Sequence, residues 1–292
     1  MTNIEKAIFG VTATVGIAAK HLATGREILQ NANDTFYTAS TFKVPLIVAL
    51  FRLVDQGKID PSERIKFSDS MRVPGSSILK VMGAGLNPTI HDLAMLMIIV
   101  SDNTATDLIF DRVGKEFLNS TITEMGLSNT RIPMTTRELL YSIVGLDPTD
   151  ESVSYEQASR MLHDQQLVLD ADGFQEDKSD VSSPSDMSKV LELIHSGGFL
   201  SDQSSEAVLN ILLRQQLNNV IPLLLPSGTK SAHKTGSYHG VRCDVGIVYG
   251  ESGPYTVAIM AKGASGISLE TDLSLARVSR AIYDEFNPDG CR

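Results

Sequence analysis

The sequence predicts an α/β protein in which an antiparallel sheet is flanked by helices and an all-α domain is inserted between the segments that form the sheet. Strand-like alternation occurs only near the two ends of the chain, whereas its middle has helical periodicity. A chain of 292 residues with 42% hydrophobic side chains can also bury a core of the necessary size. We therefore expect residues 1–38 and 206–292 to form the sheet domain and residues 39–205 to form the helical domain.

The N-terminal segment predicts a short helix followed by two strands. Ile4, Ala7 and Ile8 share one face of the helix, and Gly10 ends it. Residues 11–18 alternate as expected for a strand, and the stretch ATGREI supplies a turn and a second strand. The sheet is therefore expected to begin near the N-terminus.

The rest of the chain changes from helical periodicity back to strand alternation. Helices are expected at residues 41–57, 89–100, 104–113, 115–125, 186–196, 203–215 and 270–286. Residues 147–186 contain eleven Asp or Glu and two basic residues, which indicates a solvated acidic insertion with one helix near 154–166. Strand alternation returns in HKTGSY, DVGIVYG and YTVAIMAKG, so we expect the C-terminal segment to complete the sheet.

Composition argues against several classes of partner. The net charge is −10, the isoelectric point is about 5.1 and no run of Lys or Arg occurs, so neither nucleic acid nor a membrane surface is an expected partner. No apolar run is long enough to span a bilayer. The histidines form no HExxH motif and no Cys/His cluster, and Cys243 and Cys291 suggest no disulfide framework. We expect a small-molecule substrate, no metal and no cofactor, and the oligomeric state stays open.

The start of the chain has no recognisable export signal. Its first ten residues, MTNIEKAIFG, lack the basic start and the apolar core of a secretory leader. We therefore expect a cytoplasmic protein, or a secreted or periplasmic one if a leader was trimmed.

The stretch STFKVPLIVAL, residues 40–50, places a serine and a lysine at the start of a long apolar helix. Ser40 and Lys43 project from neighbouring positions on one helix face, so the amine can take a proton from the hydroxyl. The free N–H groups of a helix start can also stabilise an oxyanion. Alternatively, Ser40 is an N-cap and Lys43 a surface charge. Pro45, in the second turn, is expected to cost one helical hydrogen bond.

Two further motifs strengthen this pattern. S-x-x-K occurs four times in the chain, but only Ser40 starts a long apolar helix. SDN, residues 101–103, follows the helical run LAMLMIIV, and KTG, residues 234–236, begins the C-terminal strands. Taken singly, SDN is more typical of a helix-to-helix cap and KTG of a strand or turn fragment. The order SxxK, SDN, KTG is a specific signal.

These motifs resemble those of the serine β-lactamases and penicillin-binding proteins, and within them the class A β-lactamases most closely. The resemblance covers nearly the whole chain. It implies that Ser40 attacks an amide or ester carbonyl and forms an acyl-enzyme, with Lys43 as one candidate for the base. It also implies that Ser101 relays a proton to the leaving nitrogen and that Asn103 contacts the substrate and Lys43.

The resemblance assigns the KTG strand to substrate binding. Lys234 and Thr235 would contact the carboxylate of the substrate, and Gly236 belongs to the same binding strand. The backbone N–H groups of Ser40 and Ser237 would form the oxyanion hole. Removing one such donor typically costs about 10²–10³ in rate, so the backbone of Ser237 should matter more than its side chain.

Two expectations concern the charged side chains on and near this strand. Lys43 and Lys234 would face one cleft and lower each other's proton affinity, so that one of them can be a neutral base near pH 7. Arg242, on the expected strand after KTG, is either a further carboxylate clamp or a rim charge near Asp244.

The chain departs from class A at the step that hydrolyses the acyl-enzyme. Class A enzymes use a water held by a Glu and an Asn, and the corresponding stretch here is RIPMTTRELLYSIVG. Its only acid is Glu138, which is a possible deacylation base, and the position of the family's Glu falls near Thr135 or Thr136. His239 is a second candidate base. The stretch VPGSSIL, expected at one lip of the cleft, lacks an aromatic ring that relatives often have, so substrate preference stays open.

The leading hypothesis is a class A-like β-lactamase that opens β-lactam rings through an acyl-enzyme on Ser40. One alternative is a serine amidase, esterase or peptidase acting on a non-lactam substrate. Another is a penicillin-binding protein that is acylated and deacylates slowly, because acylation can survive the loss of a water-activating carboxylate.

Overall fold

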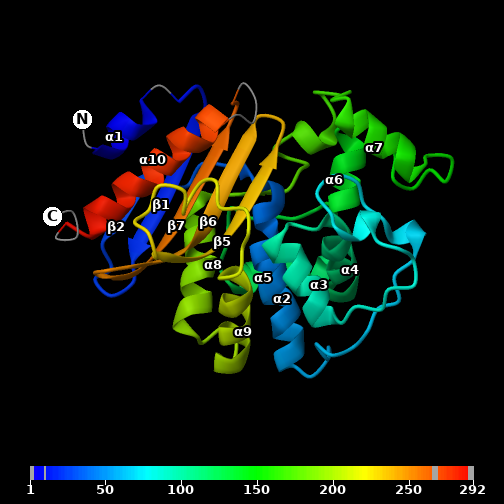
Figure 1. Ribbon diagram of the computed structural model, residues 1–292, viewed down its shortest axis with the longest axis horizontal. Coiled ribbons are helices and arrows are strands. Elements are labelled where there is room, and N and C mark those ends of the chain that lie inside the picture. The colour runs from blue at the N-terminus through cyan, green and yellow to red at the C-terminus, as the bar shows by residue number, and fades with distance from the viewer. Residues whose placement is uncertain (1–2, 10, 265–268, 289–292) are drawn as a thin grey trace.

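Strands from both ends of the chain form one five-stranded antiparallel sheet in the computed structural model, which describes residues 3–9, 11–264 and 269–288 (Figure 1). The strand order is β2-β1-β7-β6-β5. The strands are β1 (Thr14–His21), β2 (Glu27–Gln30), β5 (Lys230–Tyr238), β6 (Val241–Gly250) and β7 (Gly253–Lys262). β1 pairs with β7 along its whole length, from Thr14 opposite Lys262 to His21 opposite Tyr255. The predicted antiparallel sheet built from both ends is confirmed.

Two terminal helices cover one face of the sheet. α10 (Leu269–Phe286) packs over the strands, and α1 (Asn3–Ile8) lies against α10 (Figure 1). Buried apolar residues of α10 and the sheet form a core there, and Ile4, Ala7 and Ile8 of α1 pack against it as the sequence predicts. Gly10 and Cys291, which also entered the predictions, lie outside the described residues. Cys243 has a free, buried thiol whose pKa burial raises to about 12.

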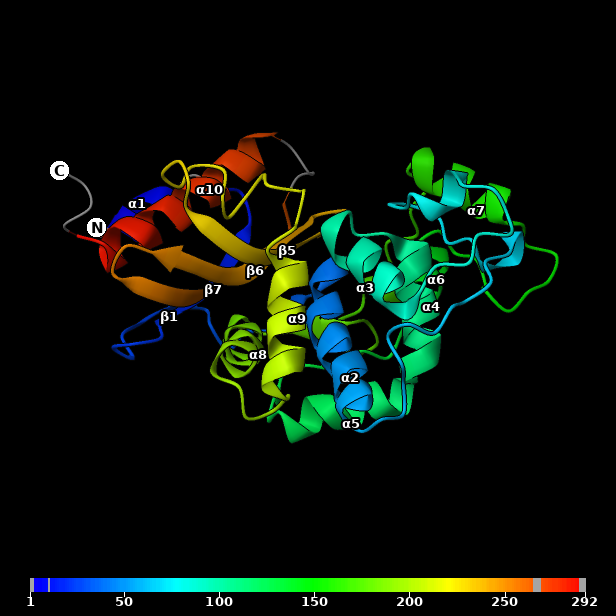
Figure 2. The same ribbon diagram turned by 60° about the horizontal axis from the view of Figure 1, so that its bottom comes forward.

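The remaining helices pack beyond the opposite face of the sheet, with α8 and α9 nearest to it (Figure 2). They are α2 (Lys43–Asp55), α3 (Ile90–Ile99), α4 (Asn103–Val113), α5 (Lys115–Glu124), α6 (Thr136–Ser142), α7 (Tyr155–His163), α8 (Pro184–Ser196) and α9 (Asp202–Leu212). A single apolar core runs from the sheet through α2 to α5. α8 comes from the segment assigned to the helical domain, but it packs on β1 and β7 of the sheet. The predicted domain boundaries stay a prediction. Among the described residues, no helix is both long and apolar enough to cross a membrane.

The helix that begins with the SxxK motif differs from the prediction at its start. Ser40 lies in a separate 3-10 turn, η1 (Ala39–Phe42), and α2 begins only at Lys43. Pro45 is the third residue of α2, and η1 continues directly into this helix with helical dihedral angles at Phe42 and Lys43. The expected loss of one helical hydrogen bond at Pro45 stays a prediction.

The C-terminal part of the acidic insertion is anchored next to the sheet and η1. Two short strands, β3 (Phe36–Tyr37) and β4 (Val181–Ser182), pair next to η1. Phe174 follows α7 and packs against Tyr238 at the end of β5, with ring centroids 5.8 Å apart. The Tyr37 hydroxyl donates to the Phe174 carbonyl at 2.5 Å. The insertion therefore contacts the end of the sheet, and α7 has a single fully buried residue, Ala158.

Candidate active site

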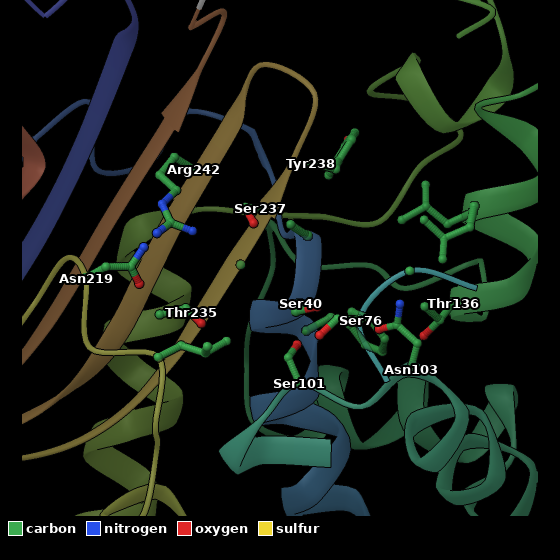
Figure 3. A pocket seen from close by; sticks show the side chains of 17 residues that line it. Ser40, Ser76, Ser101, Asn103, Thr136, Asn219, Thr235, Ser237, Tyr238 and Arg242 are labelled. Atoms are coloured by element: carbon green, nitrogen blue, oxygen red, sulfur yellow. The ribbon is translucent and has the colours of Figure 1, made fainter. Parts of the chain in front are cut away.

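A cleft of about 400 Å³ opens where the end of β5 faces η1, α4 and α6 (Figure 3). Seven of the predicted site residues line it: Ser40, Ser101, Asn103, Thr235, Gly236, Ser237 and Arg242. Lys43 and Lys234 lie fully buried next to these residues. In Figure 3, Ser40, Ser101 and Asn103 gather on the helical side of the cleft, and Thr235, Ser237 and Arg242 lie on the sheet side. The structure thus brings three distant segments of the chain to one place.

A strained turn holds Ser40 at this opening. Ala39, immediately before it, has φ 43°, a left-handed conformation that is uncommon for a residue with a side chain. Thr41 holds the turn closed by donating both its backbone N–H and its hydroxyl to the Thr38 carbonyl, at 3.0 and 2.6 Å. No capping hydrogen bond is made by the Ser40 side chain in the described turn. The interpretation of Ser40 as a helix cap is therefore wrong.

Gly236 allows β5 to pass directly over this turn. A Cβ atom at Gly236 would lie 2.8 Å from the Thr38 carbonyl oxygen, 2.9 Å from Ser40 N and 3.0 Å from Thr41 N. Only glycine fits at such a distance from three backbone atoms. The close approach brings the backbone N–H of Ser40 near that of Ser237, the two donors expected to stabilise an oxyanion.

Lys43 is a buried amine with three polar partners. Its Nζ lies 3.0 Å from the Ser101 carbonyl oxygen, 3.0 Å from Ser101 Oγ and 3.1 Å from Asn103 Oδ1. Burial lowers the pKa of Lys43 to about 7, although Asp102 and Asp107 act in the opposite direction. The alternative of a surface charge is wrong, and the amine can be neutral at physiological pH.

The SDN segment is a helix cap as well as a wall of the cleft. Asp102 is the N-cap of α4, where its carboxylate accepts from Ala105 N at 2.9 Å. The same carboxylate accepts from the backbone N–H groups of Ile78 and Leu79, which tie the neighbouring lip to α4. Ser101 has φ 57°, so the backbone turns sharply before the helix. This turn directs both oxygen atoms of Ser101 to Lys43.

Lys234 lies buried under the sheet side of the cleft. Its Nζ donates to the Thr235 carbonyl oxygen at 2.7 Å. Burial is the largest cause that lowers its pKa well below the usual value, and the nearby Lys43 lowers it further. The expected effect of two amines on each other is therefore secondary to burial. A ligand anion in the cleft would favour the charged form of Lys234.

Arg242 is held by a buried carboxylate. Its side chain is 5% exposed, and its Nε and Nη2 donate to Asp272 of α10 at 2.6 and 3.0 Å. Asn219 donates to the same carboxylate at 2.5 Å. Arg242 is therefore not a rim charge near Asp244. It lines the cleft as a fixed guanidinium whose charge is largely balanced by Asp272.

Neither candidate for the deacylation base lines the cleft. The Glu138 carboxylate accepts from Thr135 N at 2.7 Å and pairs with Lys115 at 3.1 Å, on the opposite side of α6. His239 is exposed at the end of the β5–β6 hairpin, with its ring against Phe174. Glu138 caps its own helix and does not line the cleft, so its role in activating water at Ser40 stays a prediction that this arrangement disfavours.

The face of α6 that does line the cleft is uncharged. Thr136, Leu139 and Leu140 are at i, i+3 and i+4 and project into the cleft together. Asp107 of α4 holds this helix in place by accepting from Thr136 N and Arg137 N at 2.8 and 2.9 Å. Burial raises the pKa of Asp107 to about 6. The expected position of a water-activating glutamate is therefore occupied by Thr136.

Several residues of the cleft carry no signal that was recognised in the sequence. Tyr238, Leu217 and Asn219 line the cleft, and Asp272 orients Arg242. Tyr238 directly follows Ser237, so its position could have been noticed on the strand. Asp272 and Asn219 belong to other elements, and no local pattern indicates that they meet Arg242.

This fold, with the SxxK, SDN and KTG segments around one cleft, is that of the serine β-lactamase and penicillin-binding protein superfamily. The family model described as the β-lactamase enzyme family (Beta-lactamase2) matches residues 1–286. The chain belongs to this family.

Individual relatives are distant but cover almost the whole chain. The chain is 25% identical over 295 residues to the extended-spectrum β-lactamase PER-1 of Pseudomonas aeruginosa, covering 96% of this chain and 85% of PER-1. It is 21% identical over 281 residues to β-lactamase CARB-3 of the same organism, covering 94% of this chain and 86% of CARB-3.

Solved structures give the same result. A β-lactamase from Sphaerobacter thermophilus superposes with a TM-score of 0.80 at 25% identity, covering 98% of this chain and 96% of that one. PBP-A superposes with a TM-score of 0.79 at 26% identity, covering 98% and 94%. A variant of PBP-A, solved as an acyl-enzyme complex with penicillin G, also gives 0.79 at 26% identity, covering 98% and 95%.

Proposed function

We propose that this protein opens β-lactam rings by forming an acyl-enzyme on Ser40. The observation that carries the proposal is the position of Ser40 in the cleft, one turn before a buried lysine whose pKa is lowered to about 7. Membership of the family and the β-lactamase activity named for PER-1 and CARB-3 support a β-lactam as the substrate. The acyl-enzyme of the PBP-A variant with penicillin G supports covalent capture.

The proposed acylation uses groups in or next to one cleft, of which Lys43 and Ser101 already contact each other. Ser40 Oγ attacks the ring carbonyl carbon while its proton passes to the neutral amine of Lys43. The backbone N–H groups of Ser40 and Ser237 stabilise the oxyanion. When the ring C–N bond breaks, the nitrogen takes a proton from Ser101 Oγ, which regains one from Lys43 at 3.0 Å. The product is an ester between Ser40 and the opened ring, and Lys43 is neutral again.

Hydrolysis of this ester is the slow step in the proposal. Water must add to the ester carbonyl and lose a proton to a base, and no Asp or Glu is among the described residues that line the cleft. The wall formed by Thr136, Leu139 and Leu140 offers no substitute carboxylate. We therefore assign this proton to Lys43 and expect deacylation to be slower than acylation.

Pre-steady-state kinetics with a chromogenic cephalosporin, combined with intact-protein mass spectrometry, test the proposal. The wild type should show a burst of about one equivalent followed by slow turnover, together with a mass increase of one opened substrate. Ser40→Ala should show neither. Ser76→Ala is the matched control, because Ser76 lines the same cleft while its hydroxyl donates to the Val100 carbonyl. An adduct on Ser40→Ala would refute the assignment of the nucleophile.

Since no carboxylate lines the cleft within residues 3–9, 11–264 and 269–288, a second candidate function is favoured, that of a penicillin-binding protein that remains acylated. An adduct that persists for hours without turnover would support this function over hydrolysis. If the wild type gave neither adduct nor turnover, the substrate would be a non-lactam amide or ester, and the β-lactam proposal would fail.

A further inference from the structure

Asp180 is a buried carboxyl group that the proposed reaction does not use. Its side chain is 1% exposed, and Oδ1 accepts a hydrogen bond from Met134 N at 3.0 Å. Oδ2 is buried and has no hydrogen-bond partner within the described part of the chain. An ionised carboxylate here would be a buried charge with one oxygen unsatisfied, which costs far more than an unpaired neutral hydroxyl. The surroundings therefore favour the protonated acid.

Asp180 lies at the junction of three segments. Its carbonyl oxygen accepts from the N–H and the hydroxyl of Thr38, at 3.0 and 3.3 Å, and Thr38 begins the turn that carries the nucleophile. The next residue, Val181, exchanges backbone hydrogen bonds of 3.1 and 3.0 Å with Arg131. Together with the bond from Met134 N, these contacts close the segment between 131 and 181 into a loop. Since α6 belongs to this loop, Asp180 connects a wall of the cleft to the nucleophile turn.

The charged groups around Asp180 do not balance a negative charge there. Glu138 on α6 and Asp107 on α4 are acidic, and the Tyr238 phenol faces Asp180 from β5. Lys115 on α5 is the neighbouring cation, but it is already paired with Glu138 at 3.1 Å. Burial, with a smaller contribution from the two carboxylates, raises the pKa of Asp180 well above its ordinary value.

We propose that a neutral Asp180 carboxyl holds the α6 loop, residues 131–181, against the nucleophile turn η1. We further propose that ionisation of Asp180 at higher pH weakens this connection. Asp180 is thus a positioning residue, and its effect on catalysis rests on the proposed function of Ser40. Its effect on stability does not, because the bonds to Met134 and Thr38 exist without substrate.

The first test compares the unfolding of the wild type with that of Asp180→Asn, which cannot ionise but keeps an oxygen for the Met134 N–H. The folded state holds the Asp180 proton more tightly than the unfolded chain does, so the stability that Asp180 contributes is complete at acidic pH and falls as pH rises. The ratio of unfolding constants, wild type over variant, should increase by about tenfold per pH unit above about pH 4 and level off once the folded carboxyl ionises. A ratio that does not change with pH would overturn the proposal.

Asp186→Asn is the matched control for this test. Asp186 is also buried near the end of the loop, but its carboxylate accepts from Asn129 N and Thr130 Oγ1 at 2.7 and 2.8 Å. The control should not become more stable than the wild type at alkaline pH. If it reproduces the gain of Asp180→Asn, the effect is a general one of removing negative charge, and the proposal fails.

Infrared difference spectroscopy measures the protonation state of the Asp180 carboxyl directly. The spectrum of the wild type minus that of Asp180→Asn should contain a protonated-carboxyl band that disappears as pH rises, and an absent band would overturn the proposal. In the kinetic test, the ratio of acylation rates, variant over wild type, should rise with pH. Because the infrared and unfolding experiments need no substrate, they would still decide the role of Asp180 if no β-lactam reacted with Ser40.

Discussion

Gly236→Ala should slow acylation by separating the two backbone donors of the oxyanion site. The new Cβ would meet the Thr38 carbonyl oxygen at 2.8 Å, Ser40 N at 2.9 Å and Thr41 N at 3.0 Å. All three are backbone atoms, so no change of side-chain rotamer can relieve the contact. β5 and η1 would have to separate by roughly half an ångström to restore van der Waals distances. Loss of one oxyanion donor costs about 10²–10³ in rate, or ~2.7–4 kcal/mol of transition-state stabilisation.

The assay is the acylation rate constant measured by stopped flow with a chromogenic cephalosporin. Gly83→Ala serves as the control, because a Cβ there meets no atom within 4 Å. Circular dichroism should show that both variants are folded. If Gly236→Ala acylates within about threefold of the wild type, a difference below ~0.7 kcal/mol, then the close approach of β5 to η1 does not form the oxyanion site and the reasoning fails.

Three further predictions concern the base and the wall of the cleft. Thr136→Glu combined with Leu140→Asn would place a carboxylate and an amide on the cleft face of α6, and should raise the deacylation rate by about 10²-fold or more; a rate unchanged within error would contradict the assigned position. Glu138→Gln should leave turnover within about twofold of the wild type, because Glu138 points away from the cleft, and a loss of about 10²-fold would show that it is the base after all. Since burial lowers the pKa of Lys43 to about 7, neutral amine accumulates as pH rises, and the acylation rate constant measured from pH 5 to 9 should increase through about pH 7 and then level off; a flat profile would exclude Lys43 as the base.

The sheet and the long helices could be predicted because their patterns are local. β6 and β7 are buried along nearly their whole length, and α3 and α10 have apolar residues at helical spacing, so the sequence records the burial of these elements directly. α6 was not predicted because it has only seven residues, although the capping box of Thr135 and Glu138 is a local signal for its start. The 3-10 turn before α2 was also not predicted, because no local pattern separates it from the helix that follows.

The catalytic motifs could be found from sequence, but their surroundings could not. Ser40, Ser101 and Lys234 belong to short motifs in a recognisable order, and these segments meet at one cleft. The partner of Arg242 lies on α10, and such a pairing depends on how the closing helix packs over the sheet. The degree of burial that lowers the pKa of Lys43 is likewise a tertiary property.

The pairing of β1 with β7 has a consequence for how this chain acquires its structure during synthesis. β1 leaves the ribosome more than two hundred residues before β7, the strand with which it pairs along its whole length. During that interval the backbone N–H and C=O groups on one edge of β1 lack their native hydrogen-bond partners. Long-range pairing of this kind makes folding slow, since the entropy of closing the intervening chain is lost before the contacts form. The nascent protein should therefore depend on chaperones until its final strands emerge.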